Sequence, residues 1–73
     1  MLPVESSRLA AIGYEPYSDN SGNGNLQVKF PDGDAGFYSQ VPLDVFQQFR
    51  DSPSKGKFLS VYIIPYYQFT KTG

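Results

Sequence analysis

The chain contains no cysteine, no histidine and no tryptophan in its 73 residues. Without cysteine, it has no disulfide bridges, no thiolate ligands for zinc and no nucleophilic thiols. Without histidine, it lacks the side chain that most often exchanges protons near neutral pH. These absences exclude most known arrangements of catalytic residues. We therefore expect no enzymatic activity, no cofactor and no metal.

Charge is also scarce, since six lysine and arginine residues oppose seven aspartate and glutamate residues, for a net charge of −1. A protein dedicated to nucleic-acid binding is usually clearly basic, so non-specific backbone binding is disfavoured. The longest apolar run, residues 61–64, ends at Pro65. A membrane span needs about 20 apolar residues, and the N-terminus lacks the pattern of a secretory signal. We expect a soluble, cytoplasmic protein without membrane contact.

Aromatic side chains are plentiful, with six Phe and six Tyr making up 16% of the chain. So short a chain buries only about 60% of the surface that its unfolded form exposes, which leaves room for one thin core. The rings supply enough apolar surface to build it. We predict a single domain over residues 1–73, present as a monomer.

The first part of the chain predicts a strand and a loop. Residues 6–14 place Ile12 and Tyr14 on one face of an extended segment, which Pro16 separates from any helix. Residues 17–25 are rich in Gly, Asn, Ser and Asp, which favour turns over ladder pairing. We expect this loop, 17–25, to be mobile.

Two further strands follow this loop. Residues 26–30 alternate strictly, which puts their three apolar side chains on one buried face. The sequence Pro-Asp-Gly-Asp over 31–34 favours a chain reversal, and residues 36–41 supply a third strand. The three strands together predict an antiparallel meander.

A helix of about ten residues should start at Pro42, which suits a first helical turn, because apolar residues then recur at helical spacing. Residues 55–64 allow two predictions. A second helix would be capped by Ser54 and carry Phe58, Val61 and Tyr62 on one stripe. A fourth strand would suit their three β-branched residues equally well.

Pro65 ends either element, and the polar tail should fray after Phe69. These elements together predict an α+β fold, in which a three-stranded antiparallel meander is followed by two short helices packed on one face.

Few residues form a catalytic or metal-binding pattern. The acids lie mostly in predicted turns and lack the spacing of a calcium loop. The glycines of residues 22–24 lack the Lys-Thr or Lys-Ser that follows a phosphate loop. Hydrolysis or transfer on an anion held at Ser54 is a weak hypothesis, because no imidazole or thiol can activate that hydroxyl.

Lys55 and Lys57 flank Gly56 at the start of an element. Backbone amides and two ammonium groups at this corner would bind a phosphate or the acidic side chains of another protein. Two solvated lysines beside a capped helix are the alternative interpretation.

Exposed rings favour a second kind of binding. Phe37 with Tyr38, or Tyr66 with Tyr67, could stack on the bases of RNA, although so small a chain needs most of its rings for the core. An RNA-binding module would use the following residues: Lys29, Arg50, Lys55, Lys57 and Tyr38.

Several short motifs follow one another in a distinctive order: Ser6-Ser7, Ile12-Gly13-Tyr14, Val28-x-Phe30, Tyr38-x-x-Val41-Pro42, Val45-Phe46 and Ser54-Lys55-Gly56-Lys57-Phe58. Together they resemble the KTSC domain family, and the similarity covers residues 5 to 69. The resemblance implies a domain that occurs alone in bacteria and phages and for which RNA binding is suggested.

The chain departs from the family pattern at two places. The family's central Tyr-x-Tyr aligns with residues 36–38, so the first ring is missing at Gly36. Val61, Ile64 and Pro65 stand where family members usually carry basic or polar residues. One small core cannot hold all these apolar side chains, and an exposed apolar patch usually marks a protein partner.

A free-standing chain of this family and size also resembles a small regulator of a lytic phage that binds bacterial RNA polymerase. We therefore predict a non-enzymatic regulator in the cytoplasm of a bacterial host, which binds the polymerase, inhibits host initiation and promotes antitermination. It would occupy polymerase surface that sigma or an RNA hairpin otherwise uses. The predicted contact residues are Leu2, Val4, Arg8, Lys55, Lys57, Val61, Ile64, Tyr66 and Tyr67.

Overall fold

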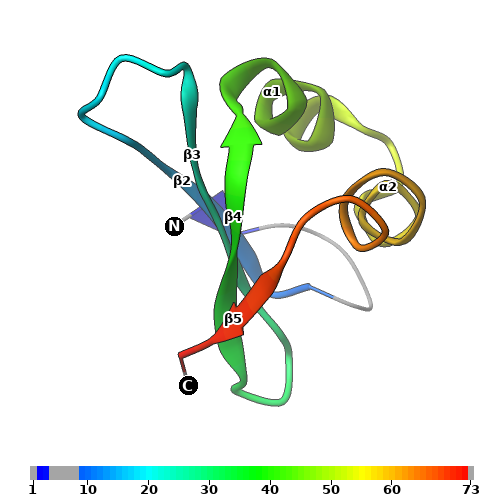
Figure 1. The fold of residues 1–73 in the computed structure, drawn as a ribbon. Helices are drawn as coiled ribbons and strands as arrows, with labels where there is room; N and C mark the ends of the chain where they lie inside the picture. The colour runs from blue at the N-terminus through cyan, green and yellow to red at the C-terminus, as the bar shows by residue number, and fades with distance from the viewer. Residues whose placement is uncertain (1, 4–8, 73) are drawn as a thin grey trace.

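An antiparallel sheet forms the centre of the computed structural model, which describes residues 2–3 and 9–72 (Figure 1). Within these residues the strands lie in chain order, β1-β2-β3-β4-β5, and each is antiparallel to its neighbours. The predicted meander is confirmed as β2 to β4, while the two short edge strands were not predicted. The strands are β1 (Leu2–Pro3), β2 (Ala11–Pro16), β3 (Asn23–Lys29), β4 (Ala35–Pro42) and β5 (Phe69–Lys71).

Alternating side chains explain why residues 26–29 form a strand with one buried face, and this strand, β3, is the middle one of the sheet. Leu26 and Val28 are fully buried, whereas Lys29 is exposed, as the alternation predicts. The turn after β3 also forms where predicted. The Phe30 N–H donates to the Asp34 carbonyl oxygen at 2.7 Å, which closes the reversal into β4.

The predicted loop 17–25 is shorter in the structure, because residues 23–25 already belong to β3 and pair with β2 or β4. Asn20 and Gly22 have positive φ values of 61° and 80°, which turn the remaining loop tightly. The Leu43 N–H donates to the Gly22 carbonyl oxygen at 3.1 Å and joins the loop to the following helix.

Two helical segments cover one face of the sheet (Figure 1). The first, α1 (Leu43–Asp51), follows Pro42 as predicted. The second consists of α2 (Lys55–Phe58) and the π-helical segment η1 (Leu59–Ile63), so residues 55–63 are helical and the strand alternative is wrong. In the part of the chain that is described, no helix is long and apolar enough to cross a bilayer.

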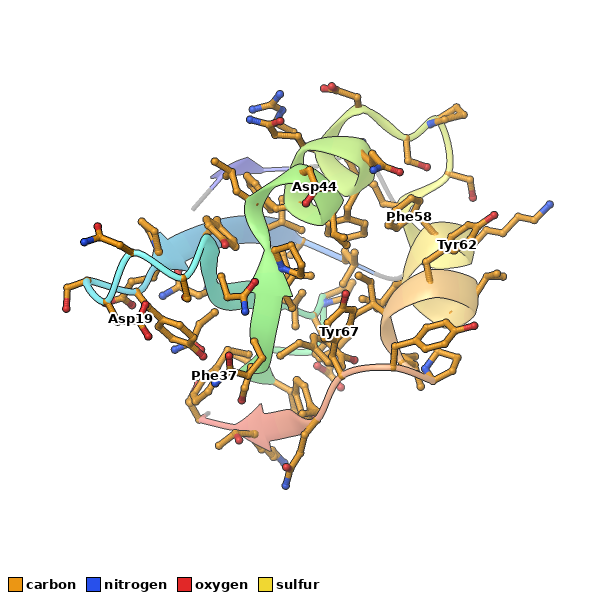
Figure 2. The ribbon with its side chains drawn as sticks, turned by 45° about the horizontal axis from the view of Figure 1, so that its top comes forward. Asp19, Phe37, Asp44, Phe58, Tyr62 and Tyr67 are labelled. Atoms are coloured by element: carbon orange, nitrogen blue, oxygen red, sulfur yellow. The ribbon has the colours of Figure 1, made fainter. Side chains whose placement is uncertain are left out.

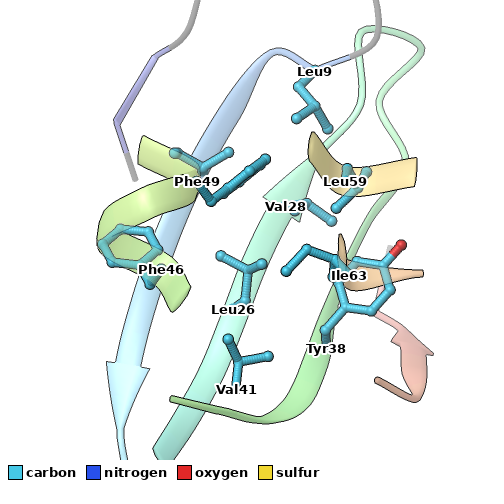
Figure 3. Close-up of a cluster of buried hydrophobic side chains, with 10 residues drawn as sticks. Leu9, Leu26, Val28, Tyr38, Val41, Phe46, Phe49, Leu59 and Ile63 are labelled. Carbon is cyan, nitrogen blue, oxygen red and sulfur yellow. The ribbon is translucent and has the colours of Figure 1, made fainter. Parts of the chain in front are cut away.

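The hydrophobic core lies between the helices and the sheet (Figure 3). In the second helix Leu59 and Ile63 are buried, whereas Val61 and Tyr62 are exposed. The predicted stripe of Phe58, Val61 and Tyr62 is therefore not the buried one. The buried hydrophobic residues are Leu9, Ile12, Leu26, Val28, Tyr38, Val41, Phe46, Phe49, Leu59 and Ile63.

Tyr14 connects the sheet to α1. Its ring stacks on Phe46 with centroids 5.0 Å apart, and its hydroxyl donates to the Val41 carbonyl oxygen at 2.7 Å. Burial raises the pKa of this phenol, and the nearby Tyr17 and Asp44 add to the rise.

The sequence predicts that the tail frays after Phe69. This prediction is wrong, because residues 69–71 pair with β4. The Phe69 ring lies 4.9 Å from the Tyr38 ring and covers Gly36. A Cβ at Gly36 would lie only 2.6 Å from Phe69 Cε1 and 2.5 Å from the Thr70 carbonyl oxygen. An aromatic ring that covers a glycine on the neighbouring strand is a recognised way to stabilise a sheet edge.

We predict that Gly36→Ala destabilises the fold by about 1–3 kcal/mol, because the new methyl group must displace β5. Urea denaturation measures this change, and hydrogen exchange should show faster exchange in residues 69–71. Ser39→Ala on the same strand is the control and should change stability by less than about 0.5 kcal/mol. Unchanged stability and exchange in Gly36→Ala would contradict this packing.

Tyr38 gives the fold a dependence on alkaline pH. Burial raises the pKa of its phenol above the ordinary value, so the folded state holds the proton more tightly than the unfolded state does. The resulting stability is complete below about pH 10 and is lost as pH rises through the raised pKa. The free energy of unfolding should fall above pH 10, and less steeply in Tyr38→Phe. Tyr66→Phe, at an exposed site, is the control, and its free energy of unfolding should fall with pH as steeply as that of the wild type. An equally steep fall in Tyr38→Phe would contradict this assignment.

Candidate functional site

Four large apolar side chains are exposed on η1 and the turn that follows it. Their exposed fractions are 46% for Val61, 56% for Tyr62, 53% for Ile64 and 73% for Tyr66. Val61 and Tyr62 belong to η1, and Ile64 and Tyr66 belong to the turn that follows it. We call these four side chains the η1 surface. Contiguous exposed apolar surface on a small domain usually marks an interaction site.

The local backbone explains why these side chains point outward. The Ile64 N–H donates to the Leu59 carbonyl oxygen, five residues earlier, at 2.9 Å, which is the wide turn of a π-helix. Leu59 and Ile63 fill the space against the sheet, so the residues between and after them face away from it. The N–H of Tyr66 then donates to the Ile63 carbonyl oxygen and closes the turn at Pro65.

The structure brings together only some of the predicted contact residues. Val61, Ile64 and Tyr66 share the η1 surface, whereas Tyr67 is half-buried and packs against the core. Leu2 pairs with Ile12 in β1, at the opposite edge of the sheet from β5. Val4 and Arg8 lie outside the described residues.

The predicted basic corner is divided between two different environments. The Lys55 ammonium donates to the Ser52 carbonyl oxygen at 3.0 Å, and its side chain is half-buried. Lys57 is exposed and forms no hydrogen bond or ion pair with the described residues. Ser54 precedes the helix, but its side chain makes no capping hydrogen bond. Of the two lysines, Lys57 is therefore the one whose ammonium group is free to contact a partner.

Of the two ring pairs predicted to stack on RNA bases, Phe37 and Tyr38 do not lie on one exposed face, whereas Tyr66 is exposed and Tyr67 is half-buried. Tyr38 is only 5% exposed, and its neighbour Phe37 points to the other face of the sheet because adjacent strand residues alternate. The basic residues predicted to contact RNA lie on three different elements, β3, α1 and α2. Lys29 lies on β3, while the Arg50 guanidinium on α1 is 3.2 Å from the Asp51 carboxylate.

Asp19 and Asp32 lie in turns, as predicted, whereas Glu15 lies in β2 and Asp51 in α1, where the sequence had predicted turns. The Asp19 carboxylate accepts a hydrogen bond from the Ser21 N–H at 3.0 Å, and bonds to the side chain and backbone of Ser21 lower its pKa. Among the described residues, no three acids lie close enough together to hold a metal ion. The hypothesis of hydrolysis or transfer at Ser54 gains no support, since Ser54 is exposed and the chain contains no histidine.

The sequence analysis missed an open groove that Phe58 borders (Figure 2) and that runs from the outer side of α1, past the connection of residues 52–54, to the second helix. It consists of a hollow of about 630 Å³ and a second of about 170 Å³. Ser52, Pro53 and Phe58 line both hollows. Helical periodicity identifies the outward side chains of α1, but it cannot show that two helices leave a gap. We call these two hollows together the Phe58 groove. Its other lining residues are Asp44, Gln47, Gln48 and Asp51 in the larger hollow, and Ser54, Lys57, Val61 and Tyr62 in the smaller one.

Comparisons with known proteins agree on one family. The model of the KTSC domain matches residues 5–67. A protein of Tsukamurella paurometabola is 34% identical over 65 residues, which cover 89% of this chain and 90% of that one. The crystal structure of a KTSC domain protein from Yersinia pestis superposes with a TM-score of 0.81 at 35% identity and covers 97% of this chain and 93% of that one. The chain therefore belongs to the KTSC domain family.

Proposed function

We propose that this KTSC domain is a non-enzymatic protein-binding module whose η1 surface docks on its partner, and that the partner is bacterial RNA polymerase. The observation that carries the docking proposal is the exposed apolar surface of Val61, Tyr62, Ile64 and Tyr66. The choice of polymerase rests on the resemblance of chain size and family to a phage regulator. The names of the matched relatives mention no such activity.

The chemistry of the η1 surface supports a protein partner. Tyrosines combine a large apolar ring with a polar hydroxyl and are enriched in protein interfaces. Two of the four side chains are tyrosines, and Val61 and Ile64 add aliphatic area beside them. A partner would remove this apolar area from water, which supplies the driving force for docking.

Charge also favours a protein over RNA. The net charge is −1. Among the described residues, the lysines and the arginine are spread over β3, α1, α2 and β5. RNA binding depends on several positive charges that contact phosphates together. Docking alone, without bond chemistry, would then be the activity. By covering polymerase surface that sigma or an RNA hairpin uses, the module would inhibit initiation and promote antitermination.

We predict that the immobilised chain recovers RNA polymerase subunits from bacterial lysate, identified by mass spectrometry. Ile64→Glu should reduce this recovery at least tenfold, because the carboxylate must lose water in an apolar interface. Ile64 is half-exposed, so the variant should keep its fold, which circular dichroism checks. Ser18→Glu adds the same charge in the exposed loop and is the matched control.

Two results would contradict the proposal. One is a wild-type pulldown without any polymerase subunit, and the other is equal recovery by Ile64→Glu and the control. An RNA affinity that falls steeply with salt, combined with an empty pulldown, would assign the module to RNA binding instead.

A further inference from the structure

We propose that the Phe58 groove binds a short peptide segment of a protein partner, in which a large apolar side chain stands between a basic and an acidic residue. This inference rests on the proposed function only in that the partner is a protein. It adds a second contact beside the η1 surface and specifies which peptide chemistry that contact accepts.

Phe58 provides a preformed seat for the apolar side chain. Its ring lies 5.6 Å from the Phe49 ring and 4.9 Å from the Tyr62 ring, so packing on two sides holds it in place. Figure 2 shows Phe58 between α1 and the second helix, with Tyr62 next to it. Phe58 is half-buried and lines both hollows, so part of its ring stays open. Because this ring is already held in place, it loses little conformational entropy when an apolar anchor residue of a partner packs against it.

The two ends of the groove carry opposite free charges. Asp44 lines only the larger hollow, and Lys57 lines only the smaller one. Both side chains are exposed, and neither forms a hydrogen bond or ion pair with a described residue. The other acid of the larger hollow, Asp51, is already paired with Arg50 at 3.2 Å.

These charges specify the occupant. A segment that crosses Phe58 meets a carboxylate at one end and an ammonium at the other, so a basic residue fits beside Asp44 and an acidic residue beside Lys57. The opposite order would place like charges together. The groove thus selects both the composition of the segment and its direction.

One segment of a second copy of this chain has a suitable sequence but is not available for binding. Residues 29–32, Lys-Phe-Pro-Asp, have the required charges around an apolar residue. However, Phe30 packs against the core and lies edge-on to Phe69, with centroids 6.3 Å apart, so it cannot insert into another molecule. Residues 29–32 of a second copy therefore do not fill the groove, and the occupant that we propose is a segment of a different protein.

The test is selection from a random 12-residue peptide library displayed on phage, with the full chain as the immobilised target. The selected peptides should contain a large apolar residue with Lys or Arg on one side and Asp or Glu on the other. Synthetic versions of these peptides should bind Lys57→Glu and Asp44→Lys about fivefold more weakly than wild type, as expected for exposed charge pairs. Replacing the acid of the peptide by Lys should restore binding to Lys57→Glu.

Lys29→Glu reverses an equally exposed charge on β3 and is the matched control, which should bind like wild type. The inference is overturned if no peptide is enriched, if the peptides show no charge order, or if both groove variants bind them like the control. Sedimentation showing that the chain dimerises through this groove would also overturn it. The two proposals can fail separately. If Ile64→Glu no longer recovers the polymerase, while Lys57→Glu and Asp44→Lys still recover it and select no peptides, the proposed function stands. The groove inference then fails.

Discussion

The packing of one helical layer on one face of a small sheet determines the rest of this structure. Phe49 on α1 and Leu59 and Ile63 on the second helix are the side chains that fill this contact (Figure 3). A chain of 73 residues has too little apolar material to cover a second face. Because Leu59 and Ile63 point inward, the four side chains of the η1 surface are left in solvent.

That constraint connects the fold to the proposed activity. The same helix that completes the core carries the η1 surface on its outer side, and its Phe58 forms the floor of the groove against α1. The interaction surface therefore lies on packed elements and needs little ordering when a partner binds. The lysines and the arginine among the described residues are spread over β3, α1, α2 and β5.

The sequence predicts elements wherever one pattern dominates. Strict alternation identifies β3, and helical spacing after Pro42 identifies α1. Prediction fails at residues 55–64, where apolar side chains occur all around the helix and periodicity cannot choose the buried face. It fails for β5 because the contact that holds this strand, Phe69 over Gly36, joins residues far apart in sequence. The two positions that align with the family's Tyr-x-Tyr, Gly36 and Tyr38, both face Phe69 on the helix-covered side. The Phe58 groove arises from the spacing of two helices, which no linear pattern records.

The most direct test of the account is hydrogen exchange of the full chain, measured by mass spectrometry with and without purified bacterial RNA polymerase. The account predicts slower exchange upon binding in peptides that cover residues 56–67, with little change in β2 and β3. Protection confined to the strands, or no protection at saturating polymerase, would contradict the claim that the outer side of the second helix is the docking surface.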